Sequence, residues 1–64
     1  MKNRLKEVRE RKKMSQEELS EKSGISRTTI SELETEKKEV TTNITLERIA
    51  KALGEKVSDI FFIS

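Results

Sequence analysis

The feature that most constrains this chain is the stretch 16–35, QEELSEKSGISRTTISELET, which predicts two short helices joined by a glycine turn. Ser15 precedes it as a favourable N-cap, and Glu18 stands where its side chain can bond back to the cap residue's own N–H. This S-x-x-E pattern predicts a helix over about residues 16–22. Gly24 then marks the turn, because glycine adopts at little cost the left-handed conformation that leads out of a helix.

A second helix is predicted from about Arg27 to Glu34, with Ser26 as its N-cap. Ile30 and Leu33, at i, i+3 spacing, give this helix one apolar edge. The residues that can then meet in one small cluster are Leu19, Ile25, Ile30 and Leu33. Such a cluster would fix the angle between the two helices.

Helices are also expected on both sides of this pair. Residues 2–13 are rich in helix formers and lack Gly and Pro, and Leu5 and Val8 give them a narrow apolar edge. Met14 is expected to fill a gap in the core. The segment 35–42 has no helical apolar period and is expected to be an irregular connection.

The best-patterned helix follows that connection. Its apolar residues recur at i, i+3, i+4 and i+7, and they are Leu46, Ile49, Ala50 and Leu53. Thr42 or Asn43 can cap its start, and Gly54 stands where a glycine commonly ends a helix. Ser58 with Asp59 is expected to begin a last short helix, over about residues 60–63.

Composition limits both the fold and the function. A chain of 64 residues supports one small core, so we expect a single all-α domain over residues 1–64, a compact bundle of five short helices. The absence of cysteine and histidine argues against thiol nucleophiles, disulfides, zinc fingers and the usual general base. We therefore expect no enzyme activity, no metal and no cofactor.

Neither the hydropathy nor the net charge points to a membrane or to a particular partner. No apolar run is long enough to span a bilayer and no signal segment is evident at the N-terminus, so a cytoplasmic location without membrane contact is expected. The net charge of +2 is only mildly basic. It does not by itself identify a nucleic-acid partner.

The stretch 16–35 resembles the helix-turn-helix of phage and plasmid repressors of the Cro and lambda-repressor kind. Five of its positions match the apolar and glycine pattern of that family: Leu19, Gly24, Ile25, Ile30 and Leu33. The resemblance extends through 46–54 and 57–61. It departs at Ser20, where alanine is usual, and at 35–36, where Asn-Gly is frequent. The resemblance implies a lambda-repressor-like domain whose helix-turn-helix spans about residues 16–34.

The resemblance further implies sequence-specific binding of double-stranded DNA, with the second helix of the motif in the major groove. Carried over by position, the base-contact candidates are Arg27, Thr28 and Glu32. Glu32 can either accept from a cytosine amino group or orient Arg27. The phosphate-contact candidates are Gln16, Ser26 and Thr29, with Lys13, Lys37 and Lys38 added for their charge. For Lys13 a solvated helix end is the alternative, and glutamates around Lys37 and Lys38 weaken the local positive field.

Two further structural features are expected, the first implied by the resemblance and the second by the residues themselves. An ion pair between Arg9 and Glu34 would tie the first helix to the third, the alternative being two unrelated surface charges. The last apolar run, IFFI at 60–63, cannot turn every side chain inward from one helical turn. We expect a dimer contact within 57–64, made by Ile60, Phe62 and Ile63, whereas ordinary exposure at the end of a chain is the alternative.

Together these features predict a transcriptional regulator, a repressor that binds an inverted-repeat operator as a homodimer and takes no small-molecule ligand. The alternative is a protein-interaction module, such as an antitoxin-like partner, which the acidic share of the surface favours.

Overall fold

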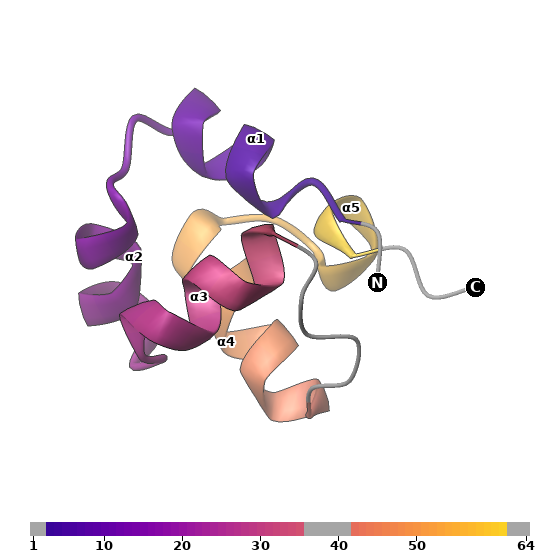
Figure 1. The fold of residues 1–64 in the computed structure, drawn as a ribbon. Coiled ribbons are helices and arrows are strands. Elements are labelled where there is room, and N and C mark those ends of the chain that lie inside the picture. The colour runs from indigo at the N-terminus through magenta and orange to yellow at the C-terminus, as the bar shows by residue number, and fades with distance from the viewer. Residues whose placement is uncertain (1–2, 36–41, 62–64) are drawn as a thin grey trace.

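The fold is that of a computed structural model, which describes residues 3–35 and 42–61. Its helices are α1 (Leu5–Arg11), α2 (Gln16–Ser23), α3 (Arg27–Glu34), α4 (Asn43–Leu53) and α5 (Val57–Ile60). Figure 1 shows α3 in front of α4, with α2 and α5 on opposite sides of this pair and α1 above it. The predicted all-α fold of five short helices is confirmed over these ranges.

The core is a single cluster to which every helix contributes. Its buried residues are Leu5, Val8, Leu19, Ile30, Leu33, Leu46, Ile49, Ala50, Leu53, Ile60 and Phe61. Met14 and Ile25 are partly buried and pack against this cluster, as the sequence predicts. The helical period of α4 places its four apolar residues on one face, which packs against α2 and α5.

Local signals fix the limits of α2 and α3. Ser15 Oγ accepts from the backbone N–H of Glu18 at 3.0 Å, and Glu18 Oε1 accepts from the N–H of Ser15 at 3.2 Å, which completes the predicted capping box. Gly24 has φ of 73° and turns the chain in the left-handed region. Ser26 Oγ then caps α3 by accepting from the N–H of Thr29 at 3.2 Å. Each helix of the motif therefore begins at the predicted residue.

The end of α2 lies one residue beyond the predicted limit, at Ser23. The hydroxyl of Ser23 is buried, donates to the carbonyl oxygen of Leu19 at 2.6 Å and accepts from the N–H of Ile25 at 3.2 Å. These bonds satisfy the buried hydroxyl, which would otherwise cost free energy. Thr42, rather than Asn43, caps α4, and Gly54 ends α4 with φ of 71°.

The first helix is shorter than the predicted 2–13 because residues 3 and 4 pair with residues 60 and 61 instead of continuing the helix. The N–H of Arg4 donates to the carbonyl oxygen of Ile60 at 2.7 Å, and Asn3 forms an antiparallel bridge with Phe61. The Asn3 side chain also accepts from the N–H of Leu5 at 3.0 Å, which places the start of α1 at Leu5. At the other end, Lys13 has a φ of 58° and cannot continue a right-handed helix.

The last helix lies earlier than predicted. It spans Val57–Ile60, since Asp59 Oδ2 accepts from the N–H of Lys56 at 3.4 Å and so satisfies a donor in front of Val57. Phe61 is extended, with φ of −111° and ψ of 127°. The predicted helix over 60–63 is therefore wrong at its start, and residues 62–63 lie outside the described residues. None of the helices within 3–35 and 42–61 is long and apolar enough to cross a bilayer.

Candidate nucleic-acid interface

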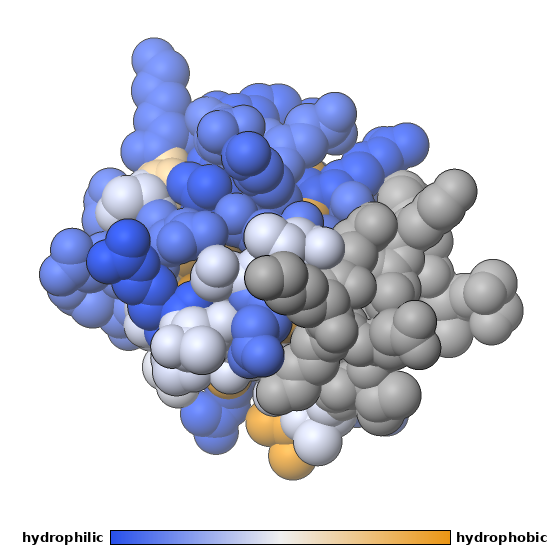
Figure 2. Space-filling view, viewed as in Figure 1, coloured by the Kyte–Doolittle hydropathy of each residue, from blue (hydrophilic) through white to orange (hydrophobic). Residues whose placement is uncertain are grey.

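The exposed edge of α3 carries the predicted base-contact residues. Arg27 and Thr28 are exposed and Glu32 is half-buried, whereas Ile30 and Leu33 on the opposite edge have no exposed surface. This division follows from the helical period, since residues 28 and 32 are i and i+4 on one face. In Figure 2 the face of the molecule that holds α3 is predominantly hydrophilic. The helix therefore presents polar groups outward from a fixed apolar support.

These three side chains share one shallow hollow with the start of α2. The residues lining it are Gln16, Arg27, Thr28, Ser31 and Glu32. The structure thus brings the base-contact candidates together with Gln16, which was predicted from its place at the head of the motif. Ser31 was not predicted, although its position four residues after Arg27 places it on the same face. Among the described residues, Arg27 and Glu32 form no ion pair with each other.

The Gln16 side chain is hydrogen-bonded to the last residue of α3. Its Nε2 donates to Glu34 Oε1 at 3.0 Å. Because a side-chain amide carries two N–H donors, this bond leaves one for an oxygen outside the protein. Gln16 is half-buried, and its bond to Glu34 orients the amide.

The first turn of α3 orders two hydroxyl groups. Ser26 Oγ donates to Thr29 Oγ1 at 2.8 Å while it accepts from the Thr29 N–H. The hydroxyl hydrogen of Thr29 is therefore the one that remains to donate outward. Ser26 is exposed and Thr29 is half-buried, and both stand at the N-terminus of a helix, where anions are favoured.

The predicted ion pair between Arg9 and Glu34 is present, and its carboxylate is the one that accepts from Gln16. Arg9 Nε donates to Glu34 Oε2 at 2.6 Å and Arg9 Nη2 donates to Oε1 at 3.2 Å. The hydrogen bond to Glu34 raises the pKa of Arg9 above its ordinary value, although partial burial opposes this. Arg9 Nη1 also donates to the carbonyl oxygen of Met14 at 2.7 Å, just before α2. One side chain thus connects α1, the α1–α2 turn and α3.

The remaining predicted site residues are not among those that line the hollow on α3. Lys13 is exposed and stands just before α2, whereas Lys37, Lys38, Phe62 and Ile63 lie outside the described residues. Ile60 has 0% exposed surface because its side chain is part of the hydrophobic core. Its predicted role in a dimer interface is therefore wrong, since a fully buried side chain offers no surface to a second subunit.

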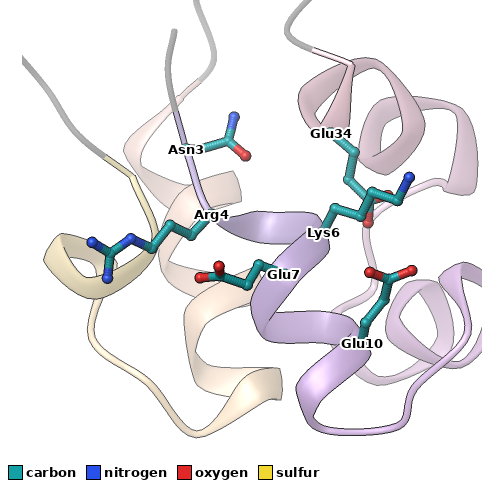
Figure 3. A pocket seen from close by; sticks show the side chains of 6 residues that line it. All are labelled: Asn3, Arg4, Lys6, Glu7, Glu10 and Glu34. Carbon is teal, nitrogen blue, oxygen red and sulfur yellow. The ribbon is translucent and has the colours of Figure 1, made fainter.

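A second hollow, beside α1, differs in its charge. It is lined by Asn3, Arg4, Lys6, Glu7, Glu10 and Glu34. Figure 3 shows the carboxylates of Glu7, Glu10 and Glu34 interspersed with the two cations. Such a mixed surface would repel a phosphate about as much as attract it.

A helix-turn-helix family model matches residues 5–60 of the chain. The chain belongs to the helix-turn-helix family, of the Cro and C1 type. Its members are DNA-binding transcriptional regulators, and this chain is a DNA-binding regulator of that kind. None of the curated proteins compared with the chain matches it. In this helix-turn-helix protein the motif is α2, the turn at Gly24 and α3, and the hollow described above lies over its two helices.

Proposed function

We propose that this helix-turn-helix protein is a repressor that binds an inverted-repeat operator as a homodimer. The observation that carries the proposal is the exposed edge of α3, where Arg27, Thr28 and Glu32 line one hollow while the opposite edge is fixed in the core. A helix held in this way can enter the major groove without rearrangement.

The base-reading roles follow from the donors and acceptors on this edge. Arg27 can donate two parallel hydrogen bonds to O6 and N7 of guanine, a contact worth about 1–3 kcal/mol of discrimination. Thr28 offers a hydroxyl to base edges and a methyl group to thymine. Glu32 can accept from the amino group of cytosine. Arg27 stands first in the helix and is exposed, so it is the principal candidate.

The phosphate contacts would flank these bases. Gln16 keeps one amide donor and Thr29 one hydroxyl hydrogen after their internal bonds, and Ser26 lies beside them at the start of α3. Lys13 is exposed just before α2 and would add a charge. Lys37 and Lys38 are proposed as further phosphate contacts on the basis of sequence alone. Contacts of this kind position the protein but do not distinguish sequences.

The dimer is proposed because one small domain touches few base pairs. Two recognition helices placed one DNA turn apart, about 34 Å, would read two half-sites. Phe62 and Ile63 are the proposed contacts, since Ile60 and Phe61 are already buried in the core.

Selection of bound duplexes from a random DNA pool tests the DNA-reading proposal. We expect an enriched palindrome with the wild-type protein. Arg27→Ala should relax the preference at one base pair of each half-site by about 1–3 kcal/mol. Arg11→Ala is the matched control, because Arg11 is also an exposed arginine but lies on α1. No enriched sequence, or equal effects of the two substitutions, would contradict the proposal.

Sedimentation at several protein concentrations tests the dimer separately. Phe62→Ser with Ile63→Ser should shift the protein toward monomer and weaken operator binding. Ile44→Ser is the control, since Ile44 is 63% exposed and is the exposed large hydrophobic residue of the described ranges. A monomer at every concentration, which protects a single half-site, would exclude the dimer.

A protein-interaction module is the second candidate function. It is favoured by the exposed carboxylates along α2, which are Glu17, Glu18 and Glu21. A salt titration separates the two functions, because DNA affinity falls steeply with salt. Binding to a protein that resists salt, together with no binding to any duplex, would favour the module.

A further inference from the structure

We propose that Lys22, Arg48 and Lys51 form a second phosphate-contacting surface, which holds the DNA backbone beside the groove that α3 enters. This inference rests on the proposed function, because it assumes that α3 binds duplex DNA. It concerns a surface built by α2 and α4 that shares no residue with the hollow on α3.

The three cations line one hollow between the end of α2 and the second half of α4. The residues lining this hollow are Lys22, Ser23, Arg48, Lys51 and Ala52. No carboxylate is among them, in contrast to the mixed hollow beside α1. Within residues 3–35 and 42–61 the ion pairs are made by Arg9, Arg11 and Lys12, so none of these three cations is in an ion pair with a described carboxylate.

Arg48 is positioned against the turn that leads into α3. A Cβ atom placed on Gly24 would lie 3.6 Å from Nη1 of Arg48, so the guanidinium rests beside this turn. Arg27, the first residue of α3, follows three positions after Gly24. The Arg48 edge of the cationic hollow therefore lies beside the turn from which α3 begins.

This placement suits a duplex better than a small anion. A helix that enters the major groove by its N-terminal end is flanked by the two phosphate backbones that border the groove, which is about 12 Å wide. One backbone would pass the start of α2, where Gln16 stands, and the other would pass the α2–α3 turn. A guanidinium donates to phosphate through a planar fork, and ammonium groups add point charges. Ser23 does not contribute, because its hydroxyl is committed to Leu19.

The alternative to a phosphate-binding role is that these cations only stabilise the helices by complementing their dipoles. Lys22 is in the last turn of α2 and Lys51 in the last turn of α4. Cations there stabilise a helix through its dipole. Such a role would alter the unfolding free energy and leave the salt dependence of DNA binding unchanged, so the two explanations predict different results.

The test measures binding to a random-sequence duplex of about 20 base pairs over a range of salt concentrations. Each phosphate contact contributes about 0.9 to the slope of log K against log salt, so Lys22→Gln with Lys51→Gln should lower the slope by about 2. Arg48→Gln should lower it by about 1, and Arg48→Lys should largely restore it. The matched control is Lys6→Gln with Lys56→Gln, two exposed lysines on α1 and before α5. Urea unfolding of each variant confirms that it is folded.

Specificity provides a second readout. The loss of a phosphate contact weakens binding to operator DNA and to random DNA alike. The ratio of the two affinities should therefore stay constant in these variants. A slope for Lys22→Gln with Lys51→Gln equal to that of the control pair would overturn the proposal. If the wild-type protein binds no duplex, the proposed function fails first, which is a different result.

Two further ligands test whether this surface binds the phosphates of DNA, a free anion or an acidic protein segment. Inorganic phosphate alone should shift the NMR signals of the Arg48 and Lys51 side chains weakly, and the duplex should shift them strongly. Shifts of equal size at matched phosphate concentration would indicate a site for a free anion. Strong binding of a polyglutamate peptide, with an unchanged DNA slope in the variants, would assign the surface to an acidic protein segment. Either result would overturn the proposal.

Discussion

Arg9 and Glu34 are joined by two parallel hydrogen bonds, of 2.6 and 3.2 Å, that connect α1 to the last residue of α3. Their side chains are only 11% and 3% exposed. Glu34 also accepts from Gln16 at the head of α2, so the first three helices converge on one carboxylate. This pair therefore ties the end of α3, the helix proposed to read DNA, to α1 and α2.

The first prediction concerns the geometry of this pair. Arg9→Lys keeps the charge but loses the planar fork and the bond to the Met14 carbonyl, and it should lower the free energy of unfolding by about 2–3 kcal/mol. Arg11→Ala is the control, since its pair with Glu55 is 61% and 25% exposed and should be worth about 1 kcal/mol or less. Urea unfolding measures both. Equal losses would show that Arg9 acts as an ordinary surface charge.

The second prediction concerns the turn of the motif. Gly24 has φ of 73°, and a Cβ there would meet only ordinary contact with Arg48, at 3.6 Å. The cost of Gly24→Ala should therefore come from the backbone alone, about 1–2 kcal/mol in unfolding free energy. Gly24→Asn should cost less, because asparagine tolerates the left-handed conformation. A loss of more than twice this size would show that the substitution also displaces α3 or Arg48.

The third prediction concerns the acidic residue of the proposed reading edge. Glu32 lines the hollow with Arg27, and among the described residues the two form no ion pair. We propose that Glu32 accepts from the amino group of cytosine. Glu32→Gln should reduce the preference for cytosine at one position by about 1–3 kcal/mol and raise the affinity for random DNA, since a carboxylate repels phosphates. Ser31→Ala, in the same hollow, should change neither. Base selection that is unchanged in Glu32→Gln would exclude the base contact.

The sequence was sufficient to predict α2 and α3 because their limits depend on neighbours. Ser15, Glu18, Gly24 and Ser26 satisfy or turn backbone groups within four residues, and the apolar spacing places Ile30 and Leu33 inward. The exposed edge that carries Arg27 follows from the same period. No tertiary contact was needed to locate the motif.

The features that the sequence did not predict depend on contacts between distant segments. Residues 3 and 4, just before α1, pair with residues 60 and 61 at the end of α5, which are far away in the sequence. The burial of Ile60 follows from the same packing. Lys22 and Arg48 meet only because α2 packs against α4, so the cationic hollow was not apparent from either segment alone.

The last prediction concerns pH. The chain has no histidine, the side chain whose ordinary pKa lies within pH 5–8. The pKa of Arg9 is raised in the folded state by its hydrogen bond to Glu34. A raised pKa contributes stability that is fully present below the ordinary pKa of arginine and that is lost only as the pH rises through the folded-state pKa, both of which lie far above neutral pH. The contribution of Arg9 to the free energy of unfolding should therefore be constant from about pH 6 to 9.

Urea midpoints measured across this range should coincide for the wild-type protein, and the difference between wild type and Arg9→Lys should not vary. A loss of stability between these limits would show that another group titrates with folding.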